Sequence, residues 1–328
     1  MNDLFYSTSL DISNTTIKIH PAIDEILTQT AQLAKELGIY ESTLYEGHHT
    51  MSPYLFTSAS PSRVVDATLW FGTLYYLDDF FGEDIQQEIS PDFDVLLTCW
   101  MDGCYKGTET HSGLRNLYTS LAYCSRQLQK NSPGAFFETY TEGLLAHLKH
   151  SINPTEYQSV EEYITSRIHF GGMYPTMGMI EYTENVYLTD AIYTAIPKLK
   201  DIQKDCALIG VLSNDIISYH KEKHSQFNLL NAYISINVVA HLEEAIRLAI
   251  AVVNTVYHSF ETHLKSIRMQ IEQFDTTTKQ TVLTYLNGLS NIVSASYHWQ
   301  ISTNRYRSEE NIFTDLRKPI DEKTTILV

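Results

Sequence analysis

Residues 62–84 read SRVVDATLWFGTLYYLDDFFGED, and this stretch predicts a long helix through the middle of the protein. The segment is apolar on almost all sides as far as Leu77. A helix that is apolar on every face is normally surrounded by other parts of the same protein. The charges then arrive together, beginning at Asp78. The sequence therefore predicts a central buried helix that carries acidic residues at its C-terminal end.

Helical periodicity extends over most of the chain. Only 9 Pro and 14 Gly interrupt the 328 residues, which favours long helices over many short strands. Apolar residues recur at helical spacing over 21–37, and Gly38 is a typical stop signal. We predict an all-α fold with further helices at 92–104, 111–131, 134–151, 158–182, 189–222, 235–270 and 276–305.

The domain organisation is expected to be simple, because the sequence shows no repeat, no low-complexity linker and no shift in composition. We predict one domain over residues 1–328. Residues 1–20 lack helical periodicity and are expected to form a loose N-terminal arm, and residues 306–328 a polar tail or flap. The stretch 47–61 is rich in His, Ser, Thr and Pro and is expected to be a loop.

The formal net charge of -16 argues against several classes of partner. Such a surface repels nucleic-acid backbones and anionic lipid, so neither is an expected partner. No apolar run has membrane-spanning length, and no signal peptide is evident at the N-terminus. The four cysteines form no CxxC pair. We expect a cytoplasmic protein without membrane insertion.

An acidic cluster follows the central apolar segment and includes Asp78, Asp79, Glu83 and Asp84. Adjacent carboxylates at a helix C-terminus repel one another and face the negative end of the helix dipole. A divalent cation would remove both problems, and oxygen ligands of this kind suit Mg²⁺. The alternative is a frayed helix end that carries ordinary surface acids.

A second polar cluster lies in the segment NDIISYHKE, residues 214–222. Asn214, Ser218 and Glu222 are four positions apart, so in a helix they share one face. They offer an amide, a hydroxyl and a carboxylate oxygen, which is a suitable ligand set for another Mg²⁺. The alternative is the polar face of an amphipathic helix.

The neighbouring sequence HKEKH, residues 220–224, is superficially like a zinc-protease helix. That motif is HExxH, in which Glu directly follows the first His. Here the position is Lys221. We therefore do not expect zinc.

Together, the two clusters resemble the motifs of class I terpene synthases. That family has an aspartate-rich DDxxxD/E motif and a downstream NDxxSxx(K/R)E motif, which correspond here to 78–83 and 214–222. The metal ligands that the resemblance implies are Asp78, supported by Asp79 and Glu83, and then Asn214, Ser218 and Glu222. It implies three Mg²⁺ ions, for which Mn²⁺ could substitute.

The resemblance extends to residues that would handle diphosphate. Arg305-Tyr306 is similar to the RY pair of the family, Arg167 to its diphosphate-sensing arginine, and Lys221 to the basic residue of the second motif. A helix break follows the sensor in the family, and Gly171 with Gly172 matches it. Relatives often have a polar residue just before the break, where this chain has Phe170.

The resemblance implies a single-domain antiparallel helical bundle with a central active-site cavity. The implied reaction is Mg²⁺-dependent ionisation of an acyclic isoprenyl diphosphate, either farnesyl or geranylgeranyl diphosphate. The carbocation would then cyclise to a sesquiterpene or a diterpene, with release of diphosphate. Homodimer formation is left open.

A carbocation needs an unreactive wall, which aromatic faces supply through cation–π attraction. Tyr75 and Phe71 lie one and two turns before Asp78 on the predicted central helix. Trp299 precedes Arg305 by six positions, and Phe56 is a weaker candidate. Plain core packing is an equally good explanation for each of these rings.

Two other functions fit a helical protein with such motifs. A chain-elongating isoprenyl diphosphate synthase would normally have two aspartate-rich motifs, whereas the second motif here is Asn/Ser/Glu. A non-catalytic helical relative that binds metal or lipid would not need the full set of polar groups. Both alternatives can be tested by assay.

Overall fold

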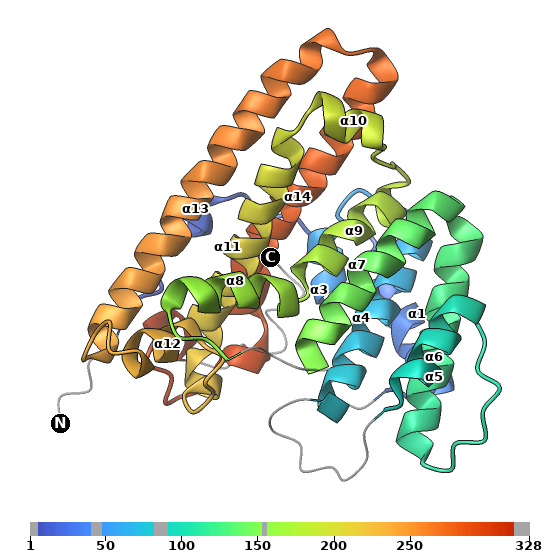
Figure 1. The fold of residues 1–328 in the computed structure, drawn as a ribbon, viewed down its shortest axis with the longest axis horizontal. Helices are drawn as coiled ribbons and strands as arrows, with labels where there is room; N and C mark the ends of the chain where they lie inside the picture. Colours follow the sequence, from blue (N-terminus) through green and yellow to red (C-terminus); the bar gives the residue numbers. More distant parts are fainter. Residues whose placement is uncertain (1–5, 41–47, 82–90, 153–155, 318–328) are drawn as a thin grey trace. The chain divides into compact units, whose positions relative to one another are not determined.

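The computed structural model describes residues 6–40, 48–81, 91–152 and 156–317, and it confirms an all-α fold for them (Figure 1). In this part of the chain the regular structure consists of α-helices and short 3₁₀ helices, with no strand. One isolated parallel bridge joins Tyr6 to Phe313.

Apart from α3 (Met51–Leu55), the helices of the N-terminal half follow the predicted order. They are α1 (Ile23–Glu36), α4 (Pro61–Phe81), α5 (Phe93–Asp102), α6 (Ser112–Asn131) and α7 (Gly134–Ile152). The C-terminal half contains α8 (Val160–Phe170), α9 (Met173–Glu184), α10 (Asp190–Ala195), α11 (Lys198–Glu222), α12 (Leu229–Ser235), α13 (Leu242–Gln270) and α14 (Thr276–Ser302). Short 3₁₀ helices include η1 (Asp11–Asn14), η3 (Asn304–Tyr306) and η4 (Thr314–Leu316).

The chain divides into two compact units. Unit 1 consists of Met1–Lys18, Leu144–Met177 and Leu188–Val328, and unit 2 of Ile19–Gly143 and Gly178–Tyr187. The single domain over 1–328 stays a prediction. Each unit is described by itself below.

Unit 2 is built around α4, as its composition predicts. Trp70 is fully buried and donates a hydrogen bond from Nε1 to the Tyr140 hydroxyl, at 2.6 Å. Its ring centroid lies 4.8 Å from that of Trp100, whose Nε1 in turn reaches Thr141 Oγ1 at 2.8 Å. Burial of these large rings, with their polar atoms satisfied, explains why α4 can be apolar on all sides.

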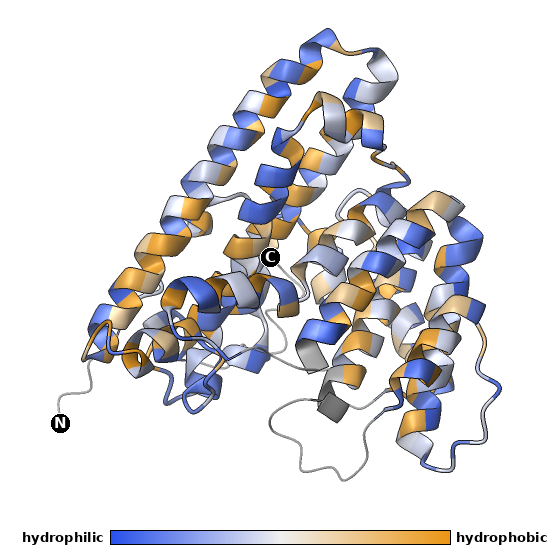
Figure 2. Cartoon of the chain, viewed as in Figure 1, coloured by the Kyte–Doolittle hydropathy of each residue, from blue (hydrophilic) through white to orange (hydrophobic). Residues whose placement is uncertain are grey.

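Unit 1 is built around α11, which packs against both α13 and α14 (Figure 1). The helix is buried from Leu199 to Ser218 on most of its faces. By contrast, α13 alternates hydrophobic and hydrophilic residues along its length, and only its apolar stripe is buried (Figure 2). No helix in the described ranges is long and apolar enough to cross a membrane.

The break predicted near Gly171 and Gly172 is confirmed, because α8 ends at Phe170 and α9 begins at Met173. Three other details of the sequence prediction were wrong. The helix predicted at 189–222 is interrupted at Ile196, since a residue before proline is pushed out of the helical region. The predicted 47–61 loop contains α3, and the helix predicted from 235 begins only at Leu242, after α12.

Residues 6–15 of the predicted N-terminal arm are hydrogen-bonded to distant parts of unit 1. The backbone N–H of Tyr6 donates to Ile312 O at 2.9 Å, and Thr8 Oγ1 donates to Asp315 Oδ2 at 2.7 Å. The backbone N–H of Asp11 donates to Asn254 Oδ1 on α13. This part of the arm is therefore anchored to the C-terminal segment.

Candidate metal and diphosphate site

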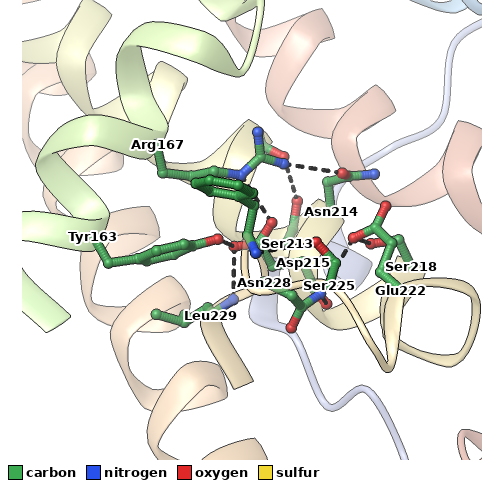
Figure 3. Close-up of polar contacts among 12 residues, drawn as sticks. Tyr163, Arg167, Ser213, Asn214, Asp215, Ser218, Glu222, Ser225, Asn228 and Leu229 are labelled. Carbon is green, nitrogen blue, oxygen red and sulfur yellow. Dashed lines mark hydrogen bonds and ion pairs between the residues drawn. The ribbon is translucent and has the colours of Figure 1, made fainter. Parts of the chain in front are cut away.

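The second motif occupies the C-terminal end of α11, which rises out of the core of unit 1. Ser218 is buried and donates a hydrogen bond from Oγ to Glu222 Oε2, at 2.7 Å (Figure 3). Asn214 lies two turns before Glu222, at the same end of the helix (Figure 3). The described structure therefore places three oxygen-bearing side chains on one stripe. Amide, hydroxyl and carboxylate oxygens are the ligands that a hard divalent cation requires, so the stripe fits such an ion.

A buried ion pair lies directly beside this stripe. Arg167 Nε on α8 donates to Asp215 Oδ1 at 2.9 Å (Figure 3). The Tyr163 hydroxyl donates to Asp215 Oδ2 at 2.6 Å, and the backbone N–H of Leu229 donates to the same oxygen at 3.1 Å. Three donors thus converge on one buried carboxylate, which offsets its desolvation.

The electrostatics of the pair follow from burial and proximity. Burial raises the pKa of Asp215 to about 6, while Arg167 and the Tyr163 hydrogen bond act in the opposite direction. Burial disfavours the charged form of Arg167, but the adjacent Asp215 carboxylate gives it a net raised pKa. Both groups are therefore mainly charged at neutral pH, as the three hydrogen bonds to Asp215 require.

Arg167 also touches the stripe of oxygen-bearing side chains, through Asn214. Its Nη2 lies 3.3 Å from Asn214 Oδ1, and its guanidinium carbon lies 5.1 Å from the centroid of the Phe170 ring. The residue predicted to sense diphosphate is therefore held between an acid, an amide and an aromatic face. The nonpolar Phe170 contributes one of these three contacts.

The two glycines after α8 are required for different reasons. A Cβ on Gly171 would lie 2.2 Å from Val211 Cγ1 on α11, so only glycine fits this close approach. Gly172 has φ +71, a left-handed conformation that side chains disfavour. The Gly171 N–H donates to Arg167 O at 3.0 Å and ends α8. The break thus places Arg167 close to α11.

The predicted RY pair follows α14, in η3. The Tyr306 hydroxyl lies 3.1 Å from Asn214 Nδ2, and the Gln300 Oε1 atom lies 2.9 Å from the same nitrogen. The Arg305 guanidinium carbon lies 5.7 Å from the Tyr306 ring centroid. The structure therefore brings Tyr306, Asn214 and Arg167 together. Lys221 lies in the last turn of α11 and is exposed.

The first motif lies at the end of α4 in unit 2. Asp78 and Asp79 belong to the last turn of that helix. Their side chains and the whole of Glu83 lie outside the described part of the structure. Their role as metal ligands stays a prediction.

The predicted aromatic wall falls partly in each unit. In unit 2, the Phe56 and Phe71 rings lie 6.1 Å apart and are almost fully buried. The Tyr75 ring stacks on His48 at 3.7 Å. Trp299 on α14 in unit 1 is 5% exposed. Their role as wall residues stays a prediction.

Four residues at this site carry no role predicted from the sequence: Tyr163, Asp215, Asn228 and Gln300. Tyr163 lies one turn before Arg167, so the i, i+4 spacing was a usable signal. Asn228 caps α12 through its Oδ1, while its Nδ2 donates to Asp215 O at 2.7 Å and to Glu222 Oε2 at 3.3 Å. No local sequence signal indicated Gln300.

Comparison with known proteins places this site in a family. A sequence profile described as "Terpene synthase family 2, C-terminal metal binding" matches residues 69–259, which is more than half of the chain and includes both motifs. Terpene synthase 4 of Physarum polycephalum is 24% identical over 305 residues, covering 86% of each chain. Delta(6)-protoilludene synthase of Armillaria gallica is 20% identical over 303 residues, covering 88% of this chain and 84% of the relative.

Solved structures show the same fold. Wild-type cucumene synthase superposes with a TM-score of 0.74 at 15% identity, covering 90% of this chain and 100% of its own. Hedycaryol synthase in complex with HEPES gives a TM-score of 0.74 at 14% identity, covering 90% of this chain and 96% of its own. With the family match, the oxygen-ligand stripe and the adjacent arginine, these likenesses show that the chain belongs to terpene synthase family 2 and is an enzyme of the class I terpene synthase type.

Proposed function

We propose that this enzyme uses Mg²⁺ to ionise an acyclic isoprenyl diphosphate and cyclises the resulting carbocation, with release of diphosphate. The observation that carries the proposal is the direct contact of Asn214 with both Arg167 and Tyr306. In one described site, a predicted metal ligand touches two residues predicted to bind diphosphate. That combination suits a reaction in which a metal-bound diphosphate departs.

The metal ligands in unit 1 are proposed to be Asn214, Ser218 and Glu222, and those in unit 2 Asp78, Asp79 and Glu83. We propose three Mg²⁺ ions, which Mn²⁺ could replace. When bound, the cations neutralise the charge that develops on the leaving diphosphate. The Ser218–Glu222 hydrogen bond keeps the hydroxyl and the carboxylate of the stripe together.

Arg167 is proposed to bind the diphosphate, together with Lys221, Arg305 and Tyr306. A guanidinium matches phosphate oxygens with two parallel hydrogen bonds, which favours arginine at this position. Asp215 holds Arg167 Nε, so the other nitrogens of the guanidinium are presented in a fixed direction. Charged donors fixed before the reaction stabilise the developing diphosphate charge more than mobile ones would. Gly171 is proposed to place the helix break against the substrate.

The hydrocarbon part of the substrate is proposed to lie against aromatic faces. Phe56, Phe71, Tyr75 and Trp299 are the proposed wall residues, each worth about 0.5–2 kcal/mol in cation–π attraction. The cation must also be shielded from water, because early capture would give an acyclic alcohol. We propose a C15 substrate ahead of a C20 one, since a relative from Cyclocybe aegerita, 23% identical over 251 residues, is named sesquiterpene synthase Agr1.

An assay with C10, C15, C20 and C25 diphosphates, with Mg²⁺ or Mn²⁺, tests the proposal. Products are identified by gas chromatography–mass spectrometry. We expect a cyclic hydrocarbon or alcohol from farnesyl diphosphate alone. A requirement for isopentenyl diphosphate would instead indicate chain elongation. Lack of any product from all four substrates would favour a non-catalytic relative.

Glu222→Gln is the matching variant for the metal assignment. It should lower turnover by at least about a hundredfold, because the stripe loses its only charged ligand. Glu261→Gln, on the exposed side of α13, is the control and should be fully active. Homodimer formation and cytoplasmic residence stay predictions, and light scattering would test the first.

A further inference from the structure

The side chain of Asn214 has two ends that differ in function. Its Oδ1 atom can bind a cation, whereas its Nδ2 group is a donor and cannot. A rotation of the amide by half a turn would therefore replace a metal ligand with a group that repels metal. Something in the protein must fix which end faces the ion.

Two hydrogen bonds of Gln300, on α14, fix the orientation of the Asn214 amide. The backbone carbonyl of Ser296 can only accept hydrogen bonds, and Gln300 Nε2 donates to it at 2.5 Å. The amide oxygen of Gln300 must then point the other way, where it accepts from Asn214 Nδ2 at 2.9 Å. This leaves Asn214 Oδ1 on the opposite side of its amide.

Burial makes this chain of contacts difficult to reverse. Gln300 is only 4% exposed, so water cannot easily satisfy a misoriented amide. A flipped Gln300 would set its oxygen against the Ser296 carbonyl and its nitrogen against Asn214 Nδ2. Buried polar groups without partners are costly, so the observed orientation is strongly preferred.

The other neighbours of Asn214 are weaker determinants. The Tyr306 hydroxyl can donate or accept, so it fits either orientation of the amide. Arg167 can only donate, and it favours the observed orientation through a contact of 3.3 Å. However, Arg167 is the residue that we expect to bind diphosphate. Gln300 is the determinant that does not depend on the substrate.

We propose that Gln300 is a positioning residue: oriented by the Ser296 carbonyl, it turns Asn214 Oδ1 toward the metal. This inference rests on the proposed function, because it assumes that Asn214 is a metal ligand. Gln300 itself touches neither metal nor substrate in this mechanism. Its effect passes through the orientation of one amide.

A double-mutant cycle between Gln300→Met and Asn214→Asp tests this role. The full-length protein is titrated with Mn²⁺ in the presence of inorganic diphosphate, and free Mn²⁺ is measured by electron paramagnetic resonance. Gln300→Met should weaken Mn²⁺ binding about tenfold, the usual size of an effect from residues that orient a ligand. In the Asn214→Asp background the same change should weaken binding less than about twofold. Both terminal atoms of a carboxylate are oxygens, so the orientation of that side chain no longer matters.

The controls separate orientation from general loss of structure. Gln203→Met makes the same chemical change on α11, about 16 Å along the axis from Asn214, and should leave Mn²⁺ affinity unchanged. Gln300→Glu still accepts from Asn214 Nδ2 but cannot donate to the Ser296 carbonyl. It should lower the melting temperature while it keeps or raises Mn²⁺ affinity, and it serves as the test if Gln300→Met does not fold.

Four outcomes would contradict the proposal, and they have different consequences. Equal weakening by Gln300→Met in both backgrounds, or loss of affinity in Gln300→Glu, would overturn the positioning role. Unchanged affinity in Gln300→Met alone would do the same and leave the proposed function standing. Wild-type Mn²⁺ affinity in Asn214→Ala would instead remove Asn214 from the metal ligands, and the proposed role of Gln300 would fail with it.

Discussion

Two aspartates of this enzyme, one in each compact unit, each accept a short hydrogen bond from a tyrosine near an arginine. In unit 1, Asp215 accepts from Tyr163 at 2.6 Å and pairs directly with Arg167. In unit 2, Asp66 accepts from Tyr182 at 2.5 Å. The same three residue types are thus used twice.

The two arginines behave differently. Arg63 donates to the backbone carbonyls of Tyr182 in α9 and of Asn131, the last residue of α6, and also to Asn185 Oδ1, so its side chain links α4 to the C-terminal ends of α6 and α9. Arg167 donates to two side chains, Asp215 and Asn214, at the end of α11. An arginine that binds main-chain carbonyls holds helices together. One that binds an acid and the amide of a proposed metal ligand is placed for a ligand.

The largest expected difference comes from removing the two acids. Asp215→Asn should cost about 3–5 kcal/mol of stability, since it leaves Arg167 as an uncompensated buried charge. It should also lower kcat/KM at least about a hundredfold, because the arginine is no longer held in place. Asp66→Asn should leave kcat/KM nearly unchanged. Urea unfolding and product formation measure the two effects, and equal losses of activity would contradict the comparison.

Replacing each arginine with lysine sharpens the contrast. Lysine has a single charged nitrogen and cannot form the paired contacts of a guanidinium. Arg167→Lys should therefore reduce kcat/KM by about ten- to a hundredfold with a small change in stability. Arg63→Lys should cost about 1–2 kcal/mol, because one of two buried carbonyls loses its donor, and keep full activity. Activity loss in Arg63→Lys without loss of stability would contradict the comparison.

The break beside Arg167 gives the next largest effect. Gly171→Ala should destabilise the protein by about 1–3 kcal/mol, since the added methyl collides with Val211. Adding Val211→Ala should recover part of that loss. Gly143→Ala is the control, because a Cβ there meets nothing within 4 Å, and it should stabilise by about 0.4–1 kcal/mol. Thermal melts of the four proteins decide the point, and no recovery in the double variant would refute the collision.

The smallest effect concerns pH in unit 2. Burial raises the pKa of Asp66 from 3.8, and its hydrogen bond from Tyr182 and the nearby Arg63 only partly oppose this. A carboxyl with a raised pKa in the folded state favours folding when protonated. Its contribution is therefore present below pH 3.8 and is lost as the pH rises through the folded pKa. The melting temperature of the wild type, minus that of Asp66→Asn, should therefore fall over that range of pH and stay constant above it.

The fold was predictable where local patterns decide it. The apolar run before Asp78 predicted α4, and Gly171 with Gly172 predicted the break after α8. The interruption at Ile196 was predictable from Pro197, and the start of α12 from the capping residue Asn228. At the site, the four-residue spacing of Asn214, Ser218 and Glu222 was sufficient to predict that their side chains share one stripe, because all three lie on one helix.

The rest of the site depends on contacts between distant segments. Gln300 reaches Asn214 across 86 positions, and Tyr163 reaches Asp215 across 52. Neither pair has a signature within its own helix. The first motif, Asp78, Asp79 and Glu83, stays a prediction. Sequence patterns identify functional residues that lie together on one helix. Their partners on other helices can be identified only once the packing of the helices is known.

The discontinuous make-up of unit 1 has a consequence for synthesis on the ribosome. All of unit 2 has been translated once Tyr187 has been added. Unit 1 includes the last segment of the chain, and Asn214 receives its partners Gln300 and Tyr306 from that segment. At about 5–20 residues per second, the interval between residues 187 and 306 lasts roughly 6–24 seconds. For that interval the nascent chain carries a complete unit 2 but lacks part of the proposed site, so we expect no turnover until these residues have been added.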